Sequence, residues 1–192
     1  KNGGVNLNYR FDIDSTGRKF TVDFDYLRYS TETNQKFNNT VYQPDNSISN
    51  QDELLGNLPS KIDIYSLKTD YTHPLKNDGA LEAGYKVSFS NTDNIADYRN
   101  VVNDIPTQNY DMSNHFRYKE IINAAYVNFN TTYKRFTFQT GLRLESTYSN
   151  GNQLGNVEKP ASEFKRTYTN LFPTVYVQYK LDSIGNNQLV VN

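Results

Sequence analysis

The sequence predicts an all-β protein, an antiparallel up-and-down meander of about seven to eight strands that forms part of a transmembrane β-barrel. Apolar and polar residues alternate through segments of roughly ten residues. In residues 136–145, for example, Phe and Leu fall on one face of a strand and Gln, Arg and Glu on the other. The connections alternate between short and long, as in barrels with tight turns on one side of the membrane and extended loops on the other.

The composition excludes a helical membrane protein but agrees with a barrel. Of the 192 residues 36% are hydrophobic, and the mean hydropathy is −0.79. No apolar run approaches the roughly 18 to 20 residues that a spanning helix needs, whereas barrel strands give alternate residues to a polar interior. The 16 Tyr and 11 Phe suit strands and membrane interfaces. Composition alone leaves a soluble β-sandwich open as the alternative.

Charge and motifs argue against an enzyme or a nucleic-acid-binding protein. The 20 basic and 21 acidic residues give a net charge of −1, without the clustered Lys and Arg of a nucleic-acid surface. No nucleophile elbow, phosphate-binding loop or dinucleotide fingerprint occurs in the sequence. His73 and His115 lack the neighbours that would complete a metal site. We therefore expect no catalytic, cofactor-binding or metal-binding residues.

The first half of the chain predicts four strands. Residues 5–14 alternate strictly, and about ten tilted residues span a bilayer. The segment after the second strand is rich in Asn, Gln, Ser and Asp and contains Pro44 and Pro59, which predicts a long polar loop. After 5–14 the expected elements are a glycine-containing turn at 15–19, a strand over 20–26, the loop over about 31–60, a strand over about 62–73, an Asp-Gly turn at 76–79 and a strand over 81–90.

The second half continues the same rhythm. Its expected elements are a long loop over about 91–114, a strand over about 118–133, a short turn at 134–135, the strand over 136–145, a long loop over about 149–166, a strand over 171–181 and a turn at 184–187. An eighth strand begins near 189. Because it ends as it starts, we interpret residues 1–192 as a single fragment of a barrel domain. We expect its open edges to pair with another copy or with the chain's own terminal strands.

The alternation also predicts which way each strand side chain faces. A charged group in contact with lipid is costly, so the lumen-facing candidates are Asp23, Asp25, Lys68, Asp70, Glu82, Lys86, Arg143, Glu145 and Lys180. The apolar positions between them would expose too large a belt for a soluble monomer. The lipid-facing candidates are therefore Leu7, Tyr9, Phe11, Val22, Phe24, Leu67, Tyr85, Val87, Val127, Phe138, Leu142, Leu144, Val177 and Tyr179.

Several short motifs carry a family resemblance. The most specific are Gly-Leu-Arg-Leu-Glu at 141–145 and Leu-Phe-Pro at 171–173. Further stretches are 4–10, 23–26 with 28–29, 70–74, 81–86, 118–126, 141–147 and 170–175. In order and spacing the chain resembles the outer-membrane β-barrel segment of TonB-dependent receptor-like proteins of Bacteroidetes type, over nearly its whole length.

The resemblance implies a barrel of about 22 strands with a plugged lumen, located in the bacterial outer membrane, with its long loops outside. Such a barrel imports a ligand with energy delivered from the inner membrane. The implied partners are membrane lipid, the protein's own plug domain, a TonB-type energy-coupling protein and an unidentified ligand. The expected function is thus a wall segment of a receptor or transporter for a bulky nutrient or metal chelate. The alternative is a non-transporting β-protein, either a small outer-membrane anchor barrel or a soluble carbohydrate-binding β-sheet domain.

Overall fold

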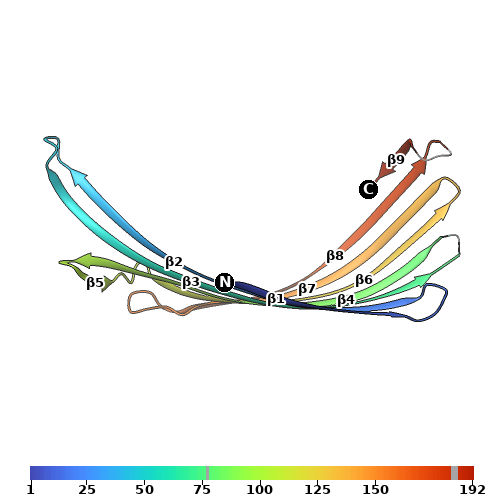
Figure 1. Cartoon of the computed structure of the whole chain (residues 1–192), viewed down its shortest axis with the longest axis horizontal. Coiled ribbons are helices and arrows are strands. Elements are labelled where there is room, and N and C mark those ends of the chain that lie inside the picture. Colours follow the sequence, from blue (N-terminus) through green and yellow to red (C-terminus); the bar gives the residue numbers. More distant parts are fainter. Residues whose placement is uncertain (77, 183–185) are drawn as a thin grey trace.

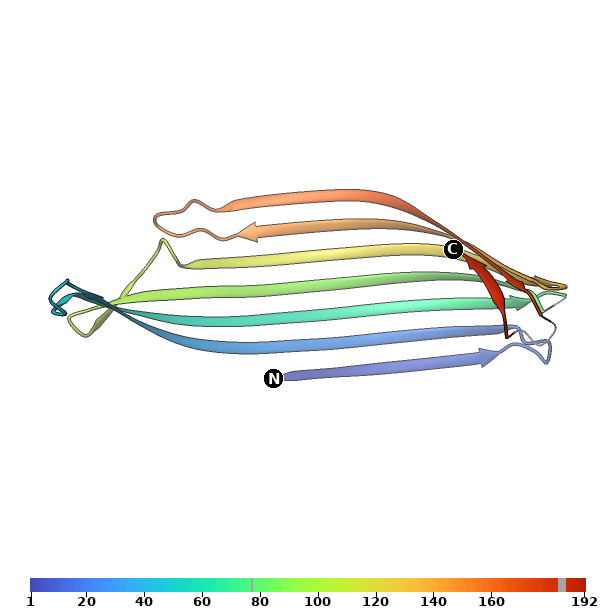
Figure 2. The same cartoon turned by 90° about the horizontal axis from the view of Figure 1, so that it is seen from above.

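The computed structural model describes residues 1–76, 78–182 and 186–192, which form one curved antiparallel sheet (Figure 1). The strands are β1 Asn2–Asp12, β2 Lys19–Tyr42, β3 Ile48–Pro74, β4 Ala80–Val102, β5 Ile105–Gln108, β6 Asn114–Tyr133, β7 Phe136–Gln153, β8 Ser162–Lys180 and β9 Gln188–Val191. Their order is β1-β2-β3-β4-β6-β7-β8-β9, with β5 paired to β4. Figure 2 shows the long strands lying side by side. The all-β antiparallel meander is confirmed.

The strands are far longer than expected, and the long polar loop expected over about 31–60 is wrong. β2 has 24 residues and β3 has 27, and they pair along nearly their whole length. Only residues 43–47 connect them. The Asn, Gln and Thr residues in this region still form a ladder, because the pairing groups belong to the backbone. Pro59 lies within β3, where the ladder with β4 is interrupted, as a residue without an N–H requires.

The long loop expected over about 91–114 is also mostly strand. β4 continues to Val102, and the chain turns through Asn103 and Asp104, whose φ angles are 52° and 63°. Two successive residues with positive φ define a type I′ hairpin, which leads here into β5. Only 109–113 then connects β5 to β6.

The third expected loop, over about 149–166, shrinks to residues 154–161. β7 extends to Gln153 and β8 begins at Ser162, and these two residues are register partners. The three long loops of the sequence interpretation are therefore the upper parts of long hairpins with short tips.

The expected short turns lie at the opposite end of the sheet, which we call the turn end. Gly17, Asp78 and Lys134 adopt positive φ angles of 90°, 53° and 55°, and each lies in the connection that the sequence predicted. The turn expected at Gly185 lies outside the described residues. The end that carries the hairpin tips is called the loop end below.

The sheet is a single layer without a hydrophobic core. Ala124 is the only buried apolar side chain among the described residues. The accessible surface is 13405 Å², against about 9,400 Å² for a compact monomer of this mass. A two-layer soluble sandwich would bury one face of each sheet, so this arrangement disagrees with that alternative. None of the described segments is a helix able to cross a membrane.

Both edges of the sheet are open. β1 pairs with β2 alone, and β9 pairs with β8 alone, among the residues that the structure describes. The expected pairing between the chain's own terminal strands is therefore not found. Pairing with another copy stays a prediction.

Candidate functional site

The strand register divides the side chains into two faces. Directly paired residues on neighbouring strands project to the same side. Phe24 pairs with Leu67, and their sequence neighbours Asp23 and Lys68 pair with each other on the opposite side. Followed from β1 to β8, the register puts all the lipid-facing candidates on one face, here called the apolar face. It puts all the lumen-facing candidates on the other, the polar face.

The polar face is the more enclosed of the two. The buried strand residues that the structure describes all project from it: they are Gly56, Ser66, Ala124, Thr147, Ser149 and Gly151. On the apolar face large side chains stay open, as with Leu7 at 61% and Leu144 at 50% exposed. Side chains converge on the inner side of a bent sheet, so the polar face is the concave side of the sheet in Figure 1.

An aromatic girdle bounds the apolar belt toward the loop end. The rings of Tyr26 and Tyr65 stack with centroids 4.8 Å apart, and the Phe89 ring lies 6.2 Å from Tyr65. The register continues this row through Ile121 to Tyr148. We call this row the loop-end girdle. Aromatic side chains at this depth are typical of the boundary between lipid tails and headgroups.

A second aromatic cluster lies at the turn end of β6, β7 and β8. The ring of Phe136 is 4.6 Å from that of Tyr179 and 5.6 Å from that of Phe138. Lys134 Nζ lies 5.3 Å from the centre of the Tyr133 ring. Between the two clusters the apolar belt spans 13 residues on β6 and on β7, slightly more than the roughly 9 to 11 residues of a tilted membrane strand.

Charged residues follow directly beyond the loop-end girdle on the apolar face. The first row contains Arg28, Asp63, Lys119 and Lys165, and the second contains Lys61, Asp93, Arg117 and Glu163. We call these the charged rows. The ion pairs are Arg28 to Asp63 at 2.7 Å, Arg117 to Asp93 at 3.2 Å and Lys165 to Glu163 at 3.0 Å. Within the described residues, Lys61 and Lys119 form no ion pair.

The polar face keeps its charges at the level of the apolar belt. Lys68 pairs with Asp70 at 2.7 Å, and Arg143 donates two hydrogen bonds to Glu145 at 2.7 and 3.0 Å. Lys86 lies directly opposite Lys68 in the register and makes no ion pair in the described part of the chain. Like charges directly opposite each other are destabilising. These cations line a recess of about 400 Å³ that also contains the ring of Phe172.

On the polar face, Gly84 of β4 leaves room for a hydrogen bond between side chains of β6 and β3. Tyr126 donates its hydroxyl proton to Asp70 across Gly84, which lies between them in the register. A Cβ on Gly84 would lie 2.4 Å from the Tyr126 ring and 2.6 Å from Asp70 Oδ1. The sequence interpretation found Asp70 but missed Tyr126 and Gly84. A glycine inside an alternating strand was the available signal, since it marks close approach of a neighbour.

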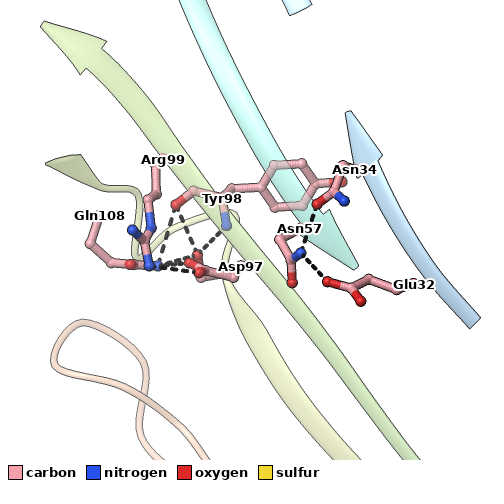
Figure 3. A network of polar contacts seen from close by, with 8 residues as sticks. Glu32, Asn34, Asn57, Asp97, Tyr98, Arg99 and Gln108 are labelled. Carbon is pink, nitrogen blue, oxygen red and sulfur yellow. Dashed lines mark hydrogen bonds and ion pairs between the residues drawn. The ribbon is translucent and has the colours of Figure 1, made fainter. Parts of the chain in front are cut away.

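The loop-end extension of the sheet is held by polar side chains (Figure 3). Asn57 Nδ2 donates to Glu32 Oε1 at 3.1 Å and to Asn34 Oδ1 at 2.7 Å. Asp97 accepts from the Arg99 guanidinium at 2.9 Å and from Gln108 Nε2 at 2.8 Å. These contacts join neighbouring strands well beyond the aromatic girdle.

Two connections at the loop end are also joined to each other. Asn156 Nδ2 donates to the carbonyls of Tyr110 at 2.8 Å and Ser113 at 3.2 Å. Lys159 reaches Asp111, with 3.6 Å between Nζ and the carboxylate. The tip of the β7–β8 hairpin is thereby fixed to the segment before β6.

One turn-end carboxyl group has a strongly shifted pKa. The Thr16 hydroxyl donates to Asp14, and the Arg18 guanidinium pairs with the same carboxylate. Together these donors lower the pKa of Asp14 from 3.8 to about 2. No group of three potential ligands that could hold a metal ion occurs in the described residues.

A curved single-layer sheet with an apolar belt, aromatic girdles and a polar concave face has the features of a transmembrane barrel wall. The sequence profile of the outer membrane protein beta-barrel family matches residues 11–192. The chain belongs to this family, and the protein is located in the bacterial outer membrane. Comparison with curated protein sequences gives no match.

Solved structures with the same fold include a transporter and an uptake receptor. The ferric citrate transporter FecA in its unliganded form superimposes with a TM-score of 0.59 at 15% identity, over 95% of this chain and 25% of that one. The ferric yersiniabactin uptake receptor FyuA from Yersinia pestis gives 0.52 at 15% identity, over 86% and 27%. The chain thus spans about a quarter of each of these proteins.

Proposed function

We propose that the chain is a wall segment of a plugged outer-membrane receptor that imports a bulky nutrient or a metal chelate. The apolar face contacts lipid, the polar face lines the lumen, and the hairpin tips of the loop end lie outside the cell. The proposed partners are a plug domain of the same protein and a TonB-type energy-coupling protein. Residues 1–192 are, on this proposal, one fragment of the barrel domain.

The observation that carries the proposal is the charged concave face. Lys68, Lys86 and Arg143 lie at the level of the apolar belt, where a barrel without a wet or protein-filled interior would hold apolar side chains. A charge in a low-dielectric interior requires a partner or water. The concave face therefore favours a lumen that contains water and polar protein over a packed apolar core.

The opposed lysines also indicate what occupies the lumen. Lys86 is half-buried, faces Lys68 across the strand pair and has no carboxylate of its own in the described residues. A carboxylate from an inserted plug would relieve the repulsion between the two ammonium groups and would accept from Arg143 as well. We infer that the plug presents an acidic side chain to this recess.

The test is made in the full-length protein. Deletion of the gene should reduce uptake of at least one bulky solute in a nutrient panel, and the intact gene should restore it. A variant with Lys68→Glu and Lys86→Glu should loosen the plug and admit a large antibiotic that the intact outer membrane excludes, at unchanged abundance of the barrel. Lys36→Glu, a matched reversal on the loop-end extension, should not.

Two results would decide against this function. Normal uptake across the panel together with a weakened envelope after gene deletion would favour the anchor barrel. If the variant with Lys68→Glu and Lys86→Glu still excludes the antibiotic, the plug does not contact this recess. The soluble carbohydrate-binding alternative is already excluded by the outer-membrane location of the family.

A further inference from the structure

The charged rows lie just beyond the loop-end girdle, on the side of the hairpin tips. The first row lies two residues beyond the loop-end girdle, as Arg28 follows Tyr26 and Lys119 precedes Ile121, and the second row lies four residues beyond it, as Lys61 precedes Tyr65. Two and four residues of strand correspond to about 7 and 14 Å along the strand, and less along the membrane normal because barrel strands are tilted. Groups at that distance from an aromatic girdle lie at the depth of lipid headgroups.

The rows carry an excess of positive charge. They hold five basic and three acidic side chains, and each acidic side chain already pairs with Arg28, Arg117 or Lys165. Lys61 and Lys119 are exposed and form no ion pair among the described residues. The cross-strand partners of Lys119 are the neutral residues Asn91 and Asn150. Lys61 lies opposite Asp93, whose carboxylate already contacts Arg117 and His115.

The excess is confined to the apolar face. Over the same two rows the polar face carries one acidic and one basic side chain, Glu120 on β6 and Arg166 on β8, and therefore no net charge. A general rise in positive charge toward the loop end would give both faces the same excess. The cations therefore follow the face that we propose to contact lipid.

We propose that the charged rows bind a phosphate-bearing lipid headgroup of the leaflet at the loop end, with Lys61 and Lys119 as the main ligands. Lys61 on β3 and Lys119 on β6 lie two strands apart and are offset by two residues along the strands. Their Cα atoms are therefore about 12 Å apart, so two extended lysine side chains can reach one headgroup. Arg117 lies between them on the route from Lys61 across β4 to β6. Its exposed ion pair with Asp93 contributes little and can be exchanged for phosphate.

The proposal rests on the proposed orientation of the apolar face toward lipid, but not on transport. It is tested with the full-length protein in phosphatidylcholine bilayers that contain spin-labelled lipids. The measured quantity is the association of spin-labelled phosphatidic acid with the protein, relative to spin-labelled phosphatidylcholine. Lys119→Gln should lower this preference about fivefold, and Lys61→Gln with Lys119→Gln about 25-fold.

The control variant is Lys36→Gln, which removes a cation from the same face but nearer the hairpin tip, where it pairs with Glu53. Its lipid preference should equal that of the unmodified protein. An unchanged preference in the double variant, or an equal loss in the control, would overturn the proposal. Full competition by millimolar inorganic phosphate would also overturn it, because the site would then select a free anion instead of a lipid. A spin label at Leu142 reports the orientation of the apolar face separately.

Discussion

Replacing Gly84 by Ala should destabilise the barrel wall by about 2 to 5 kcal/mol. The added Cβ would lie 2.4 Å from the Tyr126 ring and 2.6 Å from Asp70 Oδ1, so the hydroxyl of Tyr126 must leave Asp70. Loss of a hydrogen bond to a charged group costs about 1.5 to 3 kcal/mol, and overpacking about 1 to 3. Ala regains about 0.5 to 1 kcal/mol of backbone entropy relative to Gly.

The assay is a denaturant titration of the full-length barrel in phospholipid vesicles. Gly3→Ala is the matched control, because no atom lies within 4 Å of its added Cβ, and its free energy of unfolding should change by less than about 0.5 kcal/mol. In a Tyr126→Ala background the cost of Gly84→Ala should fall to less than half, since the ring is the main obstacle. Equal costs in both backgrounds, or a Gly84→Ala variant as stable as the control, would refute the reasoning.

Three further predictions concern orientation and pH. A spin label at Leu142 should be relaxed by lipid-soluble oxygen and one at Arg143 by a water-soluble nickel complex; the reverse pattern would invert the two faces. A cysteine at Asp45 should react with an impermeant reagent on intact cells while one at Asp78 stays unlabelled, and labelling of Asp78 alone would refute the outward loop end. The Asp14 carboxyl should titrate near pH 2 by NMR: its folded pKa is depressed, so its stabilisation is complete above the unfolded value of 3.8 and is lost as pH falls through about 2. A midpoint near 3.8 would show that the Thr16 and Arg18 contacts do not form.

The sequence predicted the strands correctly where one face of the sheet is apolar and the other is polar. Around Phe24 and Leu67 the apolar and polar residues alternate, and both the strands and the faces followed from that pattern. In 31–42 both faces are polar, so alternation gives no contrast and a strand has the composition of a loop. Backbone pairing continues there, and Phe37, Val41 and Tyr42 are too few to mark one face as apolar.

The candidate site was predictable only within single strands. Lys68 and Lys86 were each assigned to the polar face, but their opposition depends on the register between β3 and β4. The contact from Tyr126 to Asp70 depends on two registers at once and on the absence of a side chain at Gly84. Periodicity along one strand contains no information about which residue lies beside it on the next.

The β2–β3 hairpin continues about sixteen residues past the girdle, from Tyr26 to Tyr42. At a barrel tilt of about 40° this corresponds to roughly 40 Å above the lipid. Because β2 and β3 stay hydrogen-bonded almost to the tip, the part of the hairpin beyond the girdle is a rigid two-stranded ribbon and not a flexible loop. It cannot fold down residue by residue over the barrel mouth. On the proposed orientation, any closing of the entrance must swing whole hairpins about their bases, and large particles approaching the cell would meet the hairpin tips well before they reach the membrane.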